Sequence, residues 1–139
     1  LLDILISENI STNGSNIVSI MTSNSIFNNV VIRNNIYYYG FPLRLDDANL
    51  TSTNMLITDN FSEGFEINEL NGAINLLESQ IIIKNSIIWN NGQVSIFIEE
   101  SGGESSETDI TYSDIQGGWV GEGNIDADPM FYIENGQSG

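Results

Sequence analysis

The sequence predicts an all-β fold, a parallel β-helix (β-solenoid) of about five coils with three short strands in each. One motif recurs at nearly constant intervals along the 139 residues, and most intervals hold three short apolar runs, leaving no room for a helix. Ile and Asn together make up about three residues in ten, a mixture that suits strands and tight turns rather than helices.

The recurring motif consists of an apolar triplet, a polar pair, a short polar residue and a further apolar residue. Its copies begin at residues 4, 30, 55, 81 and 109, so successive copies start 26, 25, 26 and 28 residues apart. The last copy matches more loosely than the others, and aligning Ser113 with Ser86 instead would make the last step 27 residues. The copies cover residues 4–10, 30–36, 55–61, 81–87 and 109–115. Such a period indicates stacked coils, each of which buries its apolar side chains only against its neighbours.

After the motif, each of the first four coils continues with a glycine-containing turn and a second apolar run, and most coils add a third, shorter run. This order predicts three strands per coil over residues 1–116. Residues 117–139 are glycine-rich and include Pro129, which favours an irregular segment that closes the end of the same domain.

Stacking of the coils places equivalent residues directly above one another, about 4.8 Å apart. The short polar position of the motif then predicts a hydrogen-bonded ladder, because such side chains can bond turn backbone in their own or the next coil. The predicted ladder contains Asn9, Asn35, Asn60, Ser86 and Asp114. The next position predicts an inward apolar column containing Ile10, Ile36, Phe61, Ile87 and Ile115.

The apolar triplets do not alternate, although a strand with one face in water is expected to do so. Their middle residues define an outward apolar column. This column contains Leu5, Val31, Leu56 and Ile82. We expect it either to be covered or tolerated as exposed surface, or to form an interface with a partner.

Composition excludes several classes of function. The formal net charge is −16, so nucleic acid and anionic membrane surfaces would be repelled, and we expect neither nucleic-acid binding nor membrane insertion. The chain contains no cysteine and no histidine. Thiol-ligated metal sites and Ser-His-Asp chemistry are therefore excluded.

Residues 85–91, 112–118 and 121–131 resemble the end of right-handed parallel β-helix proteins of the pectate-lyase-like superfamily. The chain is most similar to bacterial secreted or surface members, which often carry a C-terminal sorting or anchor domain. The resemblance implies a right-handed helix, an extracellular or cell-surface location and a place within a larger protein. It leaves the activity open, since the superfamily includes lyases, glycosidases and adhesins.

Two kinds of catalytic site are conceivable. A lyase needs a base, for which Arg33 and Lys84 are candidates, predicted to share one column two coils apart. A glycosidase needs a pair of carboxylates near one edge of the stack. The acidic candidates are Asp46, Asp47, Glu69, Glu99 and Glu100. The competing interpretation is that all of these side chains are solvated surface charges.

Two binding sites are also predicted from local composition. Asp126 and Asp128 present alternating oxygen ligands that suit Ca²⁺, although the same carboxylates can instead accept hydrogen bonds from local backbone. Consecutive Tyr37, Tyr38 and Tyr39, with Trp89 farther along the chain, offer rings that can stack on a sugar or, alternatively, cover the core.

These features favour a noncatalytic extracellular scaffold that is adhesive or interacts with carbohydrate, as part of a larger secreted or surface protein. A polysaccharide or cell-surface glycan is the expected partner, and open coil ends could stack on further protein. The alternative is a polysaccharide lyase or glycoside hydrolase. No cofactor is expected other than a possible Ca²⁺.

Overall fold

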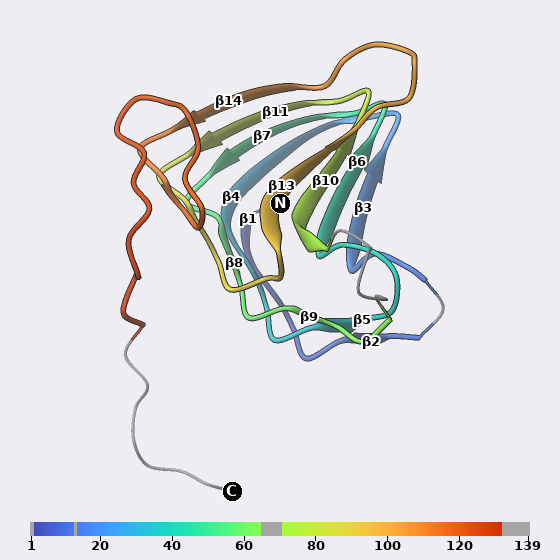
Figure 1. Cartoon of the computed structure of the whole chain (residues 1–139), viewed down its shortest axis with the longest axis horizontal. Helices are drawn as coiled ribbons and strands as arrows, with labels where there is room; N and C mark the ends of the chain where they lie inside the picture. Colours follow the sequence, from blue (N-terminus) through green and yellow to red (C-terminus); the bar gives the residue numbers. More distant parts are fainter. Residues whose placement is uncertain (1, 13, 65–70, 132–139) are drawn as a thin grey trace, which may run out of the picture.

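The computed structural model describes residues 2–12, 14–64 and 71–131, and within these ranges it contains fifteen β-strands and no helix (Figure 1). The described chain accordingly has no helix long and apolar enough to cross a membrane. Every pairing between the strands is parallel. The predicted all-β parallel β-solenoid is therefore confirmed.

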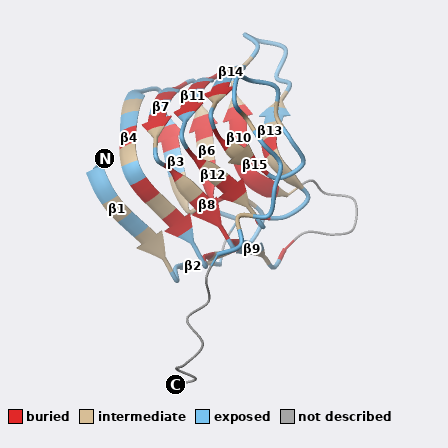
Figure 2. Ribbon diagram, turned by 90° about the vertical axis from the view of Figure 1, so that its left-hand side faces the viewer, coloured by how far each residue is buried: buried red, intermediate tan, exposed pale blue. Residues whose placement is uncertain are grey.

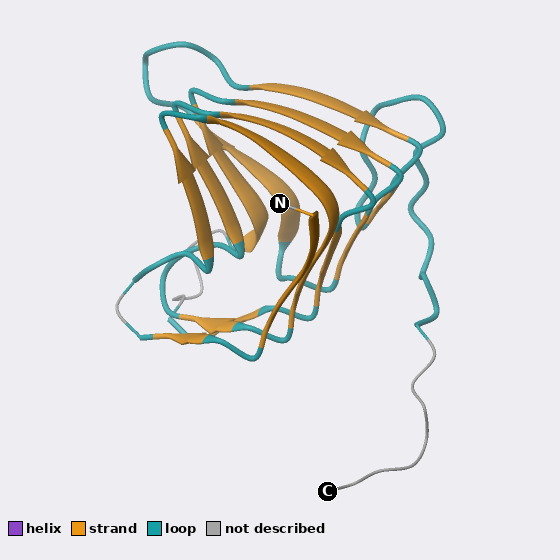
Figure 3. Cartoon of the chain, turned by 180° about the vertical axis from the view of Figure 1, so that it is seen from behind, coloured by secondary structure: helices purple, strands orange, loops and turns teal. Residues whose placement is uncertain are grey.

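The strands form three sheets, one on each side of the solenoid, and they stack coil upon coil (Figure 3). The largest sheet contains β1 (Leu2–Ser7), β4 (Asn24–Arg33), β7 (Asn49–Thr53), β8 (Leu56–Thr58), β11 (Gln80–Lys84), β12 (Ile87–Trp89), β14 (Glu107–Thr111) and β15 (Asp114–Ile115). The second contains β3 (Val18–Met21), β6 (Leu43–Asp46), β10 (Gly72–Leu77) and β13 (Val94–Glu99). The third contains β2 (Ile10–Ser11), β5 (Ile36–Tyr37) and β9 (Phe61–Ser62).

The stack comprises about four turns rather than the predicted five, and its third step is longer than the motif spacing suggests. β12 pairs with β8 so that Ile87 lies beside Leu56, 31 residues earlier. β11, which carries the fourth apolar triplet, pairs with β7 instead. β7 has no apolar triplet, and its residues alternate in burial. The motif spacing therefore aligned the fourth triplet with the triplet at residues 55–57 instead of with β7.

Each coil turns its corners with residues in the left-handed backbone region, at φ values from 46° to 59°. These residues also stack into columns. The columns are Asp3, Asn29, Asn54, Asn85 and Tyr112; Glu8, Asn34, Asp59 and Asn90; and Thr22, Asp47 and Glu78. Asn and Asp fill most of these positions, consistent with the tolerance of their short polar side chains for this conformation.

At one corner the residue after the left-handed position is always Asn, and these side chains form a ladder. Asn9 Nδ2 donates to Asn35 Oδ1 at 2.9 Å, Asn35 Nδ2 to Asn60 Oδ1 at 2.8 Å, and Asn60 Nδ2 to Asn91 Oδ1 at 2.8 Å. The same oxygens accept the backbone N–H groups of Asn9, Asn35 and Asn60. The fourth member is thus Asn91, which the predicted ladder did not contain.

The other predicted ladder members, Ser86 and Asp114, are not in the ladder. Because of the 31-residue step, Ser86 occupies a different corner. Ser86 Oγ accepts the backbone N–H of Met55, and the backbone N–H of Ser86 donates to Ser113 Oγ. Asp114 pairs with Ile87 in the largest sheet. A third corner uses serine in the same way, since Ser79 Oγ accepts the N–H of Ala48.

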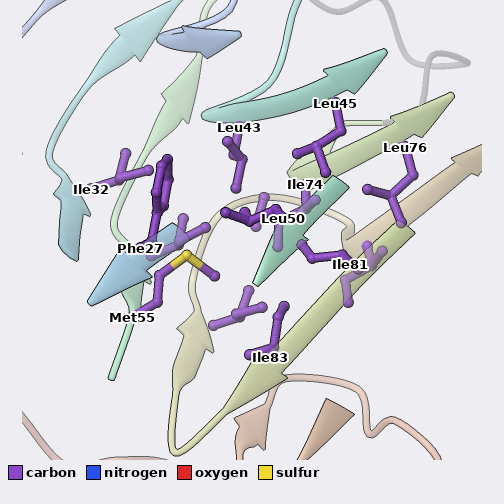
Figure 4. Packing of buried hydrophobic residues seen from close by; sticks show 14 of the residues in the cluster. Phe27, Ile32, Leu43, Leu45, Leu50, Met55, Ile74, Leu76, Ile81 and Ile83 are labelled. Atoms are coloured by element: carbon purple, nitrogen blue, oxygen red, sulfur yellow. The ribbon is translucent and has the colours of Figure 1, made fainter. Parts of the chain in front are cut away.

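The core is a continuous column of apolar side chains from the three sheets, shown buried in Figure 2 and in close view in Figure 4. Leu43, Leu45, Leu76 and Ile83 contribute to it from facing strands and are fully buried. Burying one such side chain stabilises the fold by roughly 1.5–3 kcal/mol. Coils without neighbours could not bury these residues.

The predicted inward column after the ladder is wrong. Ile10, Ile36 and Phe61 stack in register, but Ile10 is 68% and Phe61 62% exposed. The residue after each of these ladder Asn residues begins the third sheet with its side chain outward. Of the other predicted members, Ile87 is only half-buried, whereas Ile115 is buried.

The segment after β15 lies across the last coil. Ile115 N donates to Ile125 O at 3.0 Å, and Tyr112 N donates to Glu122 O at 2.8 Å. Trp119 packs against the core, and its Nε1 donates to Thr108 Oγ1 at 3.3 Å. These contacts occupy the outer edge of the final strands.

Replacing Asn60 tests the contribution of the ladder to stability. Asn60→Ala removes the acceptor of Asn35 and the buried donor to Ile32 O. Buried groups left without partners cost about 1–3 kcal/mol each, so we expect the free energy of unfolding in urea to fall by at least about 2 kcal/mol. Asn49→Ala is the control, because its exposed amide donates to the exposed Asn24 Oδ1 and its loss should cost less than about 0.5 kcal/mol. Equal losses would contradict a stabilising role for the ladder.

Candidate functional site

The two candidate bases do not share a column, so that prediction is wrong. Arg33 pairs with Ser7 and Thr58 in the lower part of the largest sheet. Lys84 pairs with Thr53 and with a residue of β14 in the upper part of the same sheet. The corner column of left-handed residues lies between the two parts. Both side chains are exposed, and the fold does not bring them together.

The predicted acidic edge is divided by the structure. Asp46 and Glu99 lie in one column of the second sheet, two coils apart, and both contact Arg44. The distances from the Arg44 guanidinium are 3.4 Å to Asp46 Oδ2 and 3.2 Å to Glu99 Oε2. Arg44 also donates to Asn75 Oδ1 at 2.7 Å. These two carboxylates therefore belong to an ion-pair network across the coils.

The remaining acidic candidates do not join this network. Asp47 is an exposed left-handed residue at the adjacent corner, and Glu100 is exposed just after β13. Glu69 lies outside the described residues. Glu99 and Glu100, which are consecutive in the chain, both line a pocket of about 360 Å³ after β13, together with Glu104.

The two calcium candidates are exposed and accept backbone hydrogen bonds. Asp126 Oδ1 accepts from Gly117 N at 3.1 Å, and Asp128 Oδ1 accepts from Met130 N at 2.9 Å. Over residues 2–12, 14–64 and 71–131, no three acidic side chains come together in a way that could hold a metal ion. The contacts match the alternative of local turn stabilisation.

The three consecutive tyrosines do not form one face. Tyr37 is fully buried, and its hydroxyl donates to Gly72 O at 3.3 Å. Burial raises the pKa of Tyr37 well above its usual value, since the tyrosinate would lose its hydration. Tyr38 and Tyr39 are exposed and pack edge to face, with ring centroids 4.9 Å apart. Trp89 lies half-buried on β12, in the same column as Arg33.

A pocket of about 340 Å³ opens beside the exposed ring of Phe61. Phe61 begins β9, and the equivalent position of the next coil is Gly92, which follows the ladder residue Asn91. Because Gly92 has no side chain, the next coil leaves the space beside the Phe61 ring unfilled. The lining residues are Asp59, Asn60, Phe61, Ser62, Asn71, Asn90, Asn91 and Gly92.

Polar groups of adjacent coils surround the pocket. Asn90 Nδ2 donates to Asp59 Oδ1 at 2.6 Å, and Asp59 Oδ2 accepts from Thr58 Oγ1 at 3.1 Å. These bonds hold the carboxylate and the carboxamide in place at the corner. Ser62 Oγ is buried and makes no hydrogen bond to a described residue. The pocket thus combines an aromatic ring with preorganised acceptors and donors.

Gly92 is required by the backbone as well as by the shape of the pocket. Its φ of +127° is one that other residues rarely adopt, and a Cβ would lie 2.6 Å from Asn71 Oδ1. That oxygen accepts the N–H of Gln93 at 2.9 Å, so it has little freedom to move. The sequence predicts a glycine-containing turn in this coil but not the pocket, because the apolar character of Phe61 predicts a place in the core.

A larger pocket of about 600 Å³ lies at the third corner. Its lining includes Asp47, Glu78, Glu104 and Glu107 but no aromatic residue. Of these side chains, Glu78 accepts a hydrogen bond at Oε1 from Ser101 Oγ. The negative charge of these carboxylates would repel an anionic ligand. The pocket also has little apolar surface on which a ring could stack.

No protein-family model, curated protein or solved structure matches the chain. The solenoid architecture follows from its strand pairing. Since one architecture can carry unrelated functions, the chemistry of the exposed side chains is the basis for a function.

The buried hydroxyl of Tyr37 predicts a loss of stability at alkaline pH. Its pKa is raised in the folded state, so its contribution is complete below the unfolded pKa of about 10 and is lost as the pH rises above that value. We expect the free energy of unfolding in urea to fall by up to about 1.4 kcal/mol per pH unit there.

Tyr37→Phe should remove that part of the alkaline slope. Tyr112→Phe is the control, because the pKa of Tyr112 is also raised, by a hydrogen bond to Glu122, but the residue is exposed and should contribute less. An unchanged slope in Tyr37→Phe would show that the Tyr37 hydroxyl does not titrate as its burial requires.

Proposed function

We propose that this chain is a noncatalytic β-solenoid scaffold that binds a neutral carbohydrate in the pocket beside Phe61. The observation that carries the proposal is the exposed Phe61 ring, placed next to an open step and flanked by the Asp59 and Asn90 side chains. Two adjacent coils supply these groups, so the site depends on the stacking and not on a single turn.

The chemistry of a sugar ring suits this arrangement. The C–H face of a pyranose packs on an aromatic ring, while its hydroxyls need both donors and acceptors at fixed positions. Asp59 supplies acceptor oxygens, Asn90 and Asn71 supply carboxamides, and Ser62 supplies a hydroxyl that lacks a described partner. The corner hydrogen bonds preorganise the Asp59–Asn90 pair, which reduces the entropy lost on binding.

The charge of the chain favours a neutral ligand over an acidic polysaccharide. The formal net charge is −16, and the pocket itself contains the carboxylate of Asp59. A uronic-acid polymer would be repelled by both the local and the overall charge. Neutral glycans avoid this cost.

The arrangement of the acids supports binding rather than hydrolysis. Among the described residues that line the pocket, Asp59 is the single carboxylate, whereas a glycosidase generally uses two. Asp46 and Glu99 are held by Arg44 on another sheet. Arg33 and Lys84 lie in separate columns, which leaves a lyase mechanism without a clustered base.

The wider setting is part of the same proposal. We place the chain in the pectate-lyase-like superfamily, as an adhesive or carbohydrate-binding part of a larger bacterial protein at the cell surface or outside the cell. Support comes from the parallel β-solenoid and from the resemblance of residues 121–131 to the ends of such proteins. A rigid stack suits this role, since it holds a binding site on a surface with little motion.

Binding to a panel of neutral oligosaccharides derived from glucan, mannan, galactan and xylan, measured by calorimetry, tests the function. For a ligand that binds, we expect Phe61→Ala to weaken the affinity by about tenfold or more, because the stacking surface is lost. Asp59→Asn should also weaken binding while preserving the left-handed corner.

Ile10→Ala is the matched control, because Ile10 is in the same column as Phe61 and is similarly exposed, two coils away. It should leave the affinity unchanged. Absence of binding across the panel, equal losses in Ile10→Ala and Phe61→Ala, or release of reducing ends from any of these glycans would overturn the proposal.

A further inference from the structure

The Asn ladder has a direction. At every step, the oxygen of the later Asn accepts the backbone N–H and the Nδ2–H of the earlier Asn; Asn35 Oδ1, for example, accepts from Asn9 at 3.0 Å and 2.9 Å. The pattern repeats from Asn35 to Asn60 and from Asn60 to Asn91. No described residue donates to Asn9 Oδ1. The ladder therefore ends at its N-terminal side with a free acceptor.

The backbone and the core end in the same way on this side. β1, β2 and β3 are outermost strands, each paired on one edge among the described residues. Ile4, Ile6 and Val18 are only partly buried, whereas their partners one coil later, Val30, Ile32 and Leu43, are fully buried. Figure 2 shows β1 at the edge of the stack, coloured as exposed or intermediate and nowhere as buried. One more coil on this side would supply a donor to the ladder, pair the open edges of the three strands and bury the three apolar side chains.

At the other end of the solenoid, the segment after β15 covers the final strands of the largest sheet, β14 and β15, whereas β13 and β9 are the outermost strands of the other two sheets. Ser113 N donates to Asn124 Oδ1 at 3.0 Å, so Asn124 takes the place that a residue of the next coil would occupy. Ile115 N donates to Ile125 O. A second copy stacked head to tail would have to displace this segment, and each copy carries a net charge of −16, so the copies repel.

We propose that the N-terminal face is a docking surface for one further parallel β-coil that carries Asn at its ladder position. The backbone N–H and Nδ2–H of that Asn donate to Asn9 Oδ1. The coil extends the three sheets through β1, β2 and β3, and it buries Ile4, Ile6 and Val18. This inference does not depend on carbohydrate binding.

A chain with an added coil tests the proposal. Residues 30–54 are duplicated and joined directly to Ile4, so that the copy of Asn54 replaces Asp3, its equivalent at the corner. The copy of Asn35 then lies at the required ladder position. We expect Tm to rise by about 4 °C or more, and the amides of β1, β2 and β3 to exchange with solvent about tenfold more slowly than in the original chain.

The matched control is the same extended chain with the copied Asn35 replaced by Ala. It should lose most of the gain in Tm, because Asn9 Oδ1 is then covered by the added coil but receives no side-chain donor. A second extension, which duplicates residues 4–29 ahead of Ile4, supplies Asn9 itself as the ladder residue. Slower exchange in either extended chain, with the loss in the Ala control, supports the proposal.

Three outcomes would overturn it. Unchanged exchange of β1, β2 and β3 in both extended chains would show that the face does not accept a coil, as would aggregation of both when the original chain is soluble. An equal gain in the Ala control would remove the role of the ladder. Dimerisation of the original chain in sedimentation, with protection of the β2 amides, would assign the face to a second copy.

Discussion

The solenoid depends on one repeated hydrogen bond at its corners. Each corner has a left-handed residue, and the backbone N–H that follows it donates to a side-chain oxygen rather than to a backbone carbonyl. A side-chain oxygen of the next coil accepts that N–H, as Asn35, Ser79 and Ser86 do at the three corners. A buried N–H without an acceptor would cost about 1–3 kcal/mol, so these short polar residues permit the chain to turn without interrupting the core.

The features that repeat locally could be predicted from the sequence. The all-β character, the parallel stacking and the alignment of Asn9, Asn35 and Asn60 all follow from a period that barely changes over the first three coils. Vertical stacking converts such a period directly into spatial contact. The glycine turns can also be predicted, because Gly92 and its preceding Asn form a strong local turn signal.

The remaining features depend on the length of each coil and on whether each side chain points into or out of the core, and hydropathy reveals neither. The longer third coil moved Ser86 to another corner and placed Asn91 in the ladder. Phe61 is as apolar as a core residue, yet its position directly after the corner turns it outward, while Tyr37 turns inward from the next position. The pocket therefore could not be predicted from the sequence, because the prediction requires knowing whether each residue after a corner points inward or outward.

The longer step between Asn60 and Asn91 has an evolutionary consequence. The coils on both sides of it keep their strand pairing, so the additional residues are accommodated without altering the core. They enter the chain between Ser62 and Asn71, two residues that also line the pocket beside Phe61. Changes in length at this point can thus reshape the pocket while the stack that carries it stays the same.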